Sequence, residues 1–312
     1  MPLHNCDLVI VGGGVAGSTA ALYGRRFGLD LLVLERAAPG GQTASASCIE
    51  NYPGFPEGIT GPELAQNVTD QALKVGVEYI SAEVMGLSHT GSGRWIVHTD
   101  QGDVETTALI IATGASPRHL NVPGERELAG RGVSYCATCD GFFFRGQTVA
   151  VVGGGNTAVD EAIYLSEICA KVYLIHRRDE FRCEKFLQDR LGARTNIEIV
   201  WDSVVVEIRG EEGVDNVRVR NVKTGEDRVL ELQGVFIAIG NVARTDWLGD
   251  YVEREDGFIP TNENMETNAP GIFAAGDVRK TLVRQITTAV GNATTAAFFA
   301  YHYVQGFPER KS

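Results

Sequence analysis

The sequence has few cysteines for its length and no hydrophobic run long enough to cross a bilayer. Its 312 residues include only 6 cysteines, too few for a secreted scaffold held together by disulfides. No apolar stretch approaches the roughly 20 residues that a membrane-spanning helix needs. The apolar start contains Asp7 and continues into glycines, which is not the pattern of a signal peptide. We therefore expect a cytoplasmic protein.

Positive charge is also scarce. The 28 Lys and Arg residues face 40 Asp and Glu residues, for a formal net charge of -12, whereas proteins that bind nucleic acid usually carry an excess of basic residues. Hydrophobic residues make up 44% and charged residues 22%, which is typical of a soluble globular protein. At roughly 150 residues per domain, the length predicts two domains. We expect an enzyme without a nucleic-acid or membrane partner.

A glycine motif follows the first predicted strand. The spacing Gly12-x-Gly14-x-x-Gly17 lies between a short β-branched run and a predicted helix. In dinucleotide-binding proteins the first glycine allows a tight turn, the second lets the backbone approach a pyrophosphate, and the third lets helix and strand pack closely. The next predicted strand ends at Glu35, where a carboxylate can accept hydrogen bonds from a ribose diol. The motif favours an adenosine with a plain ribose over a glycine turn without a ligand.

The same pattern recurs later, with the opposite charge. Gly153-x-Gly155-x-x-Ala158 again lies between a predicted strand and a predicted helix. At the position equivalent to Glu35 the second copy has a basic segment, which consists of His176, Arg177, Arg178 and Arg182. Guanidinium groups favour a phosphate on the ribose hydroxyl. The second copy therefore predicts an NADP(H) site, the alternative being a solvated basic helix start.

Each copy also has a later strand that ends in a turn of the type small-x-Gly. These turns are Ala112-Thr113-Gly114 and Ala238-Ile239-Gly240. Weaker strand patterns lie over residues 94–98 and 217–222, and a helix is expected near 62–75. The repeat predicts an α/β protein with two related, Rossmann-like, three-layer nucleotide-binding domains.

A CxxC pair precedes the second glycine motif. Cys136 and Cys139 are followed directly by Asp140. Structural zinc usually needs a second pair or added histidines, and the other four cysteines form no such pair. Two inert buried thiols remain an alternative. We favour a redox disulfide, because the CxxC spacing depresses the pKa of one thiol, with Asp140 as a candidate proton donor and acceptor.

Taken together, these motifs closely resemble those of the low-molecular-weight, bacterial-type thioredoxin reductases, over essentially the whole chain. The matching segments, in order, are 12–17, 40–42, 50–54, 112–115, 136–143, 153–158, 176–182 and 271–278. The resemblance implies a discontinuous FAD-binding domain over 1–116 and 247–312, with an NADPH-binding domain over 117–246 inserted into it. It also implies a homodimer with thioredoxin as the protein substrate.

The resemblance further implies roles for individual residues. The FAD ligands would be Gly12, Gly14, Gly17, Glu35, Gly41, Gln42, Asn51, Asp277, Arg284, Gln285 and Ile286. The NADPH ligands would be Gly155, Asn156, Thr157, Ala158, His176, Arg177, Arg178 and Arg182. Cys139 would be the thiol on the flavin side, Cys136 the thiol that attacks the substrate, and Asp140 the acid and base. Arg131, Phe142 and Phe143 match positions that touch thioredoxin, although core packing is an alternative for the two phenylalanines.

Other functions remain open at this point. The same relay could serve another CxxC carrier, such as a glutaredoxin-like or peroxidase-associated protein, or the fold could be a non-catalytic binding module. The segment between Asp277 and Arg284 departs from the family's usual Lys-Pro pattern but keeps its spacing. The arginines that follow His176 argue for NADPH, because related reductases that use other electron donors tend to lack them.

Overall fold

The computed structural model describes residues 4–46 and 48–307, and the chain divides into two compact units. The first unit contains residues 1–116 and 242–312, and the second contains residues 117–241. The segments that link the units form two short paired strands, β7 (Ala115–Pro117) and β16 (Asn241–Ala243). Residues 242–246, which we expected in the inserted domain, belong to the first unit because Ala243 packs into its core.

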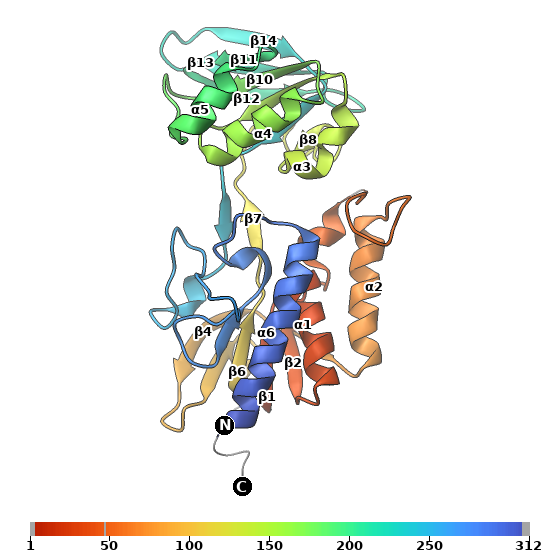
Figure 1. The fold of residues 1–312 in the computed structure, drawn as a ribbon, viewed down its shortest axis with the longest axis vertical. Coiled ribbons are helices and arrows are strands. Elements are labelled where there is room, and N and C mark those ends of the chain that lie inside the picture. The colour runs from red at the N-terminus through yellow and green to blue at the C-terminus, as the bar shows by residue number, and fades with distance from the viewer. Residues whose placement is uncertain (1–3, 47, 308–312) are drawn as a thin grey trace. The chain divides into compact units, whose positions relative to one another are not determined.

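A mixed sheet forms the centre of the first unit (Figure 1). Its strand order is β3-β2-β1-β6-β5-β4, and β17 also pairs with β6. Strands β1, β2, β3, β6 and β17 are parallel, whereas β5 pairs antiparallel with both β4 and β6. The strands are β1 (His4–Val11), β2 (Leu31–Glu35), β3 (Glu78–Ser81), β4 (Val84–His89), β5 (Trp95–Thr99), β6 (Gly102–Ile111) and β17 (Ile272–Ala274).

Alternate side chains of the parallel strands face two different layers. Leu8 and Ile10 of β1 pack with apolar residues of α1 (Val15–Arg26) and α6 (Ile286–Gly306). Val9 and Val11 face the opposite side and pack with residues of β4, β5 and the segment after β16. Helix α2 (Gly61–Lys74) lies beside α1 (Figure 1). Short 3₁₀ helices are η1 (Gly41–Ser45), η3 (Asp246–Leu248) and η4 (Gly276–Val278).

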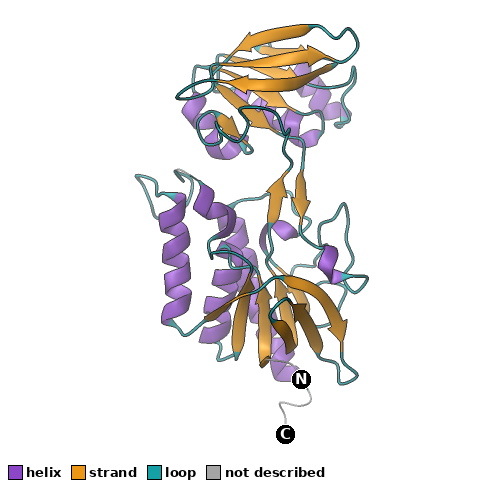
Figure 2. Cartoon of the chain, turned by 180° about the vertical axis from the view of Figure 1, so that it is seen from behind, coloured by secondary structure: helices purple, strands orange, loops and turns teal. Residues whose placement is uncertain are grey.

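The second unit contains a parallel sheet and a separate antiparallel sheet (Figure 2). The parallel sheet has the order β11-β10-β9-β15-β8 and the antiparallel sheet the order β12-β13-β14. The strands are β8 (Val133–Ser134), β9 (Thr148–Val152), β10 (Lys171–Ile175), β11 (Ile197–Val200), β12 (Ser203–Arg209), β13 (Asn216–Asn221), β14 (Asp227–Glu231) and β15 (Gly234–Ile237).

The parallel sheet of this unit is buried on both faces. Val149 and Val151 pack with the helices α3 (Ala137–Asp140), α4 (Asn156–Ser166) and α5 (Lys185–Gly192). Ala150 and Val152 pack with the antiparallel sheet on the other face. The 3₁₀ helix η2 (Gly141–Phe144) follows α3 directly. Continuous apolar strands are typical of this sandwiched position, so the predicted class of two Rossmann-like α/β units is confirmed.

The predicted elements correspond closely to observed ones. The strands expected over 94–98 and 217–222 are β5 and β13, each displaced by one residue, and the helix expected near 62–75 is α2. Within residues 4–46 and 48–307, none of the helices is long and apolar enough to span a membrane.

Candidate functional site

The first glycine turn joins β1 to α1 at the carboxyl end of the sheet. Gly12 has a φ of 105°, and a Cβ on Gly17 would overlap the carbonyl oxygen of Gly12. The fold itself therefore requires glycine at both positions. Gly14 differs, because the nearest atom to a Cβ there is the Gly41 Cα at 3.8 Å. This open approach to the backbone is what a bound pyrophosphate needs.

The carboxylate of Glu35 is held at the turn by two backbone N–H groups. Gly13 N donates to Oε2 at 2.6 Å, and Ala37 N donates to Oε1 at 2.9 Å. These bonds orient a half-buried carboxylate at the tip of β2, with lone pairs left to accept further hydrogen bonds. The structure thus brings Glu35, the glycine turn and Gly41 together.

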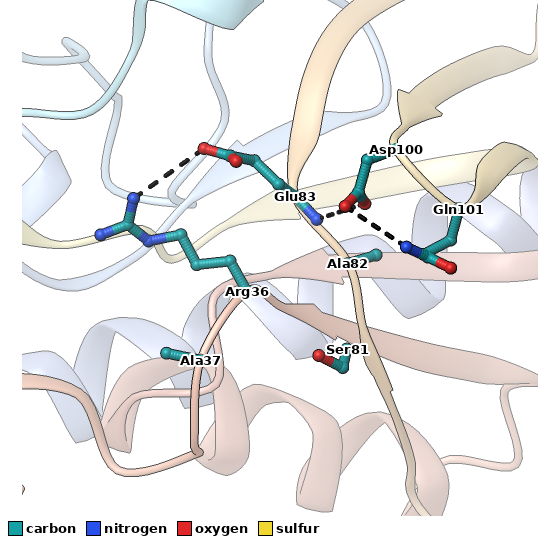
Figure 3. Close-up of a pocket in the computed structure, with 7 residues that line it drawn as sticks. All are labelled: Arg36, Ala37, Ser81, Ala82, Glu83, Asp100 and Gln101. Carbon is teal, nitrogen blue, oxygen red and sulfur yellow. Dashed lines mark hydrogen bonds and ion pairs between the residues drawn. The ribbon is translucent and has the colours of Figure 1, made fainter.

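A cavity of about 390 Å³ lies beyond the tips of β2 and β3 (Figure 3). Arg36 pairs with Glu83 at 3.9 Å across it, and Glu83 N donates to Asp100 Oδ1 at 2.8 Å. Our sequence analysis missed this cavity, although the carboxyl ends of neighbouring parallel strands are where ligands bind in such sheets. Its lining residues are Arg36, Ala37, Ser81, Ala82, Glu83, Asp100 and Gln101.

Asp277 follows β17 at the same edge of the sheet and is half-buried. Burial raises the pKa of Asp277, and the nearby charge of Arg284 opposes that shift. The Arg284 guanidinium lies 4.5 Å from the ring centroid of Phe258, and its buried Nε has no hydrogen-bond partner among the described residues. A buried carboxylate and a buried guanidinium nitrogen thus offer hydrogen-bonding capacity at this edge.

The remaining residues of the first set lie around the start of α6. Asn51 Nδ2 donates to Gln285 Oε1 at 3.2 Å. Gln285 is the N-cap of α6 and forms a capping box with Thr288, so that Ile286 begins the helix. The Gln42 side-chain amide donates to the carbonyl of Ala115. These contacts hold three polar side chains in defined positions within the first unit.

The second glycine turn joins β9 to α4. A Cβ on Gly153 would overlap the carbonyl oxygen of Ala238, whereas a Cβ on Gly155 would meet no atom within 4 Å. Asn156 and Glu184 hold the start of the helix through reciprocal bonds of 3.1 and 3.0 Å. As at Gly14, the middle glycine leaves the backbone open to a ligand.

The basic segment after β10 packs against this turn. Arg182 N donates to the carbonyl of Gly154 at 2.9 Å. The side chains of Arg177, Arg178 and Arg182 are exposed, and none has an ion-pair or hydrogen-bond partner among residues 4–46 and 48–307. Three guanidinium groups without a counter-ion make a strong candidate for binding a phosphate.

His176 differs from these three arginines in its burial, and its role toward a phosphate stays a prediction. His176 is only 5% exposed, and its ring stacks on Phe181 and bonds through Nε2 with the carbonyl of Glu180 at 3.0 Å. Burial lowers the pKa of His176. A Cβ on Gly154 would overlap the His176 ring, which makes the histidine part of the support for the turn.

Cys136 and Cys139 form a disulfide, with their Cα atoms 5.3 Å apart. We call residues 136–141 the redox turn. Ser134 Oγ donates to Asp140 Oδ2 at 2.7 Å and accepts from Cys136 N at 3.1 Å. Burial raises the pKa of Asp140, and the bond from Ser134 opposes that shift. A carboxyl with a raised pKa beside a disulfide is suited to donate and accept a proton there.

Two aromatic side chains stand exposed after the redox turn. Phe142 is 57% and Phe143 is 46% exposed, so neither is a core residue. The Arg145 guanidinium lies 5.1 Å from the ring centroid of Phe142. Arg131 donates to the backbone carbonyls of Glu127 and Glu211. Exposed aromatic residues beside arginine are typical of protein-binding surfaces.

Comparisons with known proteins agree with this arrangement. The sequence model of the pyridine nucleotide-disulphide oxidoreductase family matches residues 6–293. A thioredoxin reductase of Bacillus subtilis is 43% identical over 307 residues, which cover 97% of this chain and 96% of the relative. The crystal structure of thioredoxin reductase from Streptococcus pyogenes superposes with a TM-score of 0.92 at 46% identity, covering 97% of this chain and 99% of that one. The Giardia duodenalis thioredoxin reductase also gives a TM-score of 0.92, at 33% identity and with the same coverage. The chain therefore belongs to the pyridine nucleotide-disulphide oxidoreductase family.

Proposed function

We propose that the chain is an NADPH-dependent thioredoxin-disulfide reductase that uses FAD. Two electrons from NADPH reduce the Cys136–Cys139 disulfide, which then reduces oxidised thioredoxin by thiol–disulfide exchange. The observation that carries this proposal is a CxxC disulfide in a chain that also has two glycine turns with opposite charge at their strand tips.

We assign FAD to the first unit, over 1–116 and 242–312. The open backbone at Gly14 and the oriented carboxylate of Glu35 suit the pyrophosphate and the ribose. The cavity beside Arg36 suits the adenine end by its position beyond β2 and β3. The proposed ligands are the glycine turn, Glu35 and the set Gly41, Gln42, Asn51, Asp277, Arg284, Gln285 and Ile286.

We assign NADPH to the second unit, over 117–241. The N–H groups at the start of α4, over residues 155–158, suit the pyrophosphate. Arg177, Arg178 and Arg182 suit the 2′-phosphate, because their guanidinium groups are exposed and have no partner in the described chain. His176 supports the glycine turn through its contact with Gly154 and stays a proposed NADPH ligand beside the arginines.

The cofactors, when bound, supply hydride transfer and two-electron reduction. The chain supplies the disulfide and the proton chemistry around it. Asp140, whose pKa is raised by burial, donates a proton at a sulfur that leaves as thiolate and takes it back when the disulfide forms again. Ser134 holds the Asp140 carboxyl through its hydroxyl. We keep Cys139 as the flavin-side thiol and Cys136 as the thiol that attacks thioredoxin.

The proposal also covers the contacts with thioredoxin, the oligomeric state and the cellular location. Arg131, Phe142 and Phe143 are proposed to touch thioredoxin, and the exposure of both phenylalanines supports that role. We also propose a cytoplasmic homodimer. Light scattering of the purified protein tests the assembly, since the chain has a mass of 33.7 kDa and a dimer has twice that mass.

Serine variants of the redox pair test the function directly. Cys136→Ser and Cys139→Ser should each abolish thioredoxin reduction yet leave flavin bleaching by NADPH intact, because the disulfide acts after that step. Cys48→Ser is the matched control, since Cys48 has no disulfide partner and its variant should keep full activity. A wild-type protein that NADPH bleaches but that reduces only a different CxxC carrier would point to the alternative substrate. A colourless protein would indicate a binding module instead.

A further inference from the structure

The main chain of the redox turn is bonded to a carboxyl on the neighbouring helix. Ala137, a fully buried residue between the two cysteines, donates its N–H to Glu161 Oε1 at 3.4 Å. The other oxygen, Glu161 Oε2, is buried and has no hydrogen-bond partner in the described chain. Helix α4 packs tightly here, since a Cβ on Gly141 would lie 2.8 Å from Leu165 Cδ2 and 3.2 Å from Tyr164 Cε1. Glu161 therefore lies directly behind the redox turn.

Within residues 4–46 and 48–307, no cation pairs with the Glu161 carboxyl. Burial raises the pKa of Glu161 to about 7, and the single bond from Ala137 offsets little of that shift. The lysines on the elements beside α4 are paired elsewhere, Lys185 with Asp189 at 2.9 Å and Lys171 with Glu198 at 2.7 Å. The titratable groups on those elements are Cys136, Cys139 and Asp140 at the redox turn, Lys185, Asp189 and Arg190 on α5, Lys171 and Tyr173 on β10, and Glu198 on β11.

We propose that Glu161 is a positioning residue for the Cys136–Cys139 disulfide and that its carboxyl takes up a proton when this disulfide is reduced. The inference rests on the proposed catalytic role of the disulfide. In both redox states Glu161 holds the Ala137 N–H and with it the backbone between the cysteines. A negative charge that appears on a nearby sulfur disfavours a second one on Glu161, so the two titrations are coupled.

Reduction of the Cys136–Cys139 disulfide takes up two electrons and, with Glu161, two protons. Two electrons from NADPH break the S–S bond. One sulfur takes a proton and becomes a thiol, and this proton is matched by the one that NADPH releases on oxidation to NADP⁺. The other sulfur stays a thiolate, and Glu161 takes a second proton from solvent. When the dithiol reduces the disulfide of the substrate, the S–S bond forms again and Glu161 releases its proton. Asp140 remains the group that exchanges a proton with the leaving sulfur.

The test compares Glu161→Gln with the wild-type holoenzyme. Glutamine keeps the shape and the acceptor for Ala137 but cannot titrate. The ratio of dithiol to disulfide is measured by thiol labelling after equilibration with dithiothreitol buffers between about pH 6 and 9. At about pH 6 the two proteins should match, because Glu161 is then already neutral. At about pH 8.5 the variant should hold about three- to tenfold more dithiol, since one unit of pKa coupling is a tenfold effect.

Asp160→Asn is the matched control, because it removes an exposed carboxylate from the adjacent position of the same helix. It should follow the wild-type curve at every pH. Parallel curves for Glu161→Gln and wild type would overturn proton uptake by Glu161, and so would a control that diverges as Glu161→Gln does. The serine variants of the cysteines decide the role of the disulfide separately, so failure of the inference and failure of the proposed function are distinguishable.

An infrared measurement keeps the inference testable if Glu161→Gln fails to fold. Reduction of the wild-type holoenzyme at about pH 8 should add the C=O stretch of a protonated carboxyl. The same difference spectrum is recorded on the Cys136→Ser, Cys139→Ser double variant. Subtracting it from the wild-type spectrum removes the contribution of groups that respond to reduction of the flavin alone. No gain in that band after subtraction would overturn the inference.

Discussion

We expect the preference for one nicotinamide cofactor to depend on a few exposed side chains. The side chains of Arg177 and Arg178 are exposed and lack a counter-ion in the described chain. A charge-assisted hydrogen bond to phosphate is worth about 1.5–3 kcal/mol, and about 1.4 kcal/mol changes an equilibrium constant tenfold. Solvent screening reduces this value for exposed groups. We therefore expect these two arginines to give a preference for NADPH over NADH of about a hundredfold in kcat/KM.

The double variant Arg177→Ala, Arg178→Ala tests this assignment. KM for NADPH should rise about tenfold to a hundredfold, while NADH kinetics stay nearly unchanged, because NADH has no 2′-phosphate to lose. Steady-state rates with both cofactors measure the difference. Arg190→Ala, which removes an exposed arginine of α5, should change neither. Equal losses with both cofactors would mean that the arginines support the fold.

Retention of FAD tests a proposed flavin ligand of the first unit, again at the level of a single residue. Asp277→Asn should loosen FAD, because a charge-assisted bond to a ribityl hydroxyl, worth about 1.5–3 kcal/mol, becomes a neutral one. The fraction of FAD retained after dialysis is the measurement. Asp250→Asn removes an exposed carboxylate elsewhere in the first unit and should retain FAD fully. Equal retention by both variants contradicts the role of Asp277.

At the scale of the elements, Gly153 and Gly155 of the second glycine turn have different roles. Gly153 is surrounded by backbone and by Ala158, whereas a Cβ on Gly155 would meet open space. Gly153→Ala should therefore destabilise the unit by about 1–3 kcal/mol, or roughly 4–12 °C in Tm. Gly155→Ala should cost less than about 1 kcal/mol but weaken NADPH binding about tenfold or more, because the methyl group would occupy the approach to the pyrophosphate. Calorimetry and a binding titration separate the two effects. An unchanged NADPH affinity in Gly155→Ala would contradict the assignment.

The sequence predicted those elements whose patterns are local. Strand β9, its glycine turn and α4 could be predicted, because apolar periodicity and glycine spacing are patterns among residues that are close in the sequence. The cavity beside Arg36 was missed because it joins segments from β2, β3 and the β5–β6 turn, whose registers the sequence does not show. The burial of His176 was not predicted because it depends on contact with Phe181 and Gly154. Glu161 gave no signal at all, since one acidic residue in a helix is usually solvated.

At the scale of the whole molecule, each unit has its own hydrophobic core. Leu109 and Ile111 of the first unit pack only with residues of 1–116 and 242–312, and Val149 and Val151 of the second unit only with residues of 117–241. Chains with separate cores commonly depart from two-state unfolding. A ligand stabilises the fold to which it binds by RT ln(1 + [L]/Kd), so each cofactor should stabilise its own unit.

We therefore expect two thermal transitions in calorimetry of the holoenzyme. Removal of FAD should lower the transition of the first unit and leave the other in place. Saturating NADP⁺, at about a hundred times its Kd, should stabilise the second unit by about 2.7 kcal/mol and raise only its transition, by roughly 5–15 °C. The Arg177→Ala, Arg178→Ala variant should lose most of that rise yet respond to FAD removal like the wild type, which assigns each transition to a unit. A single transition that shifts with either cofactor would show that the two cores unfold together, and the independence of the units would then be wrong.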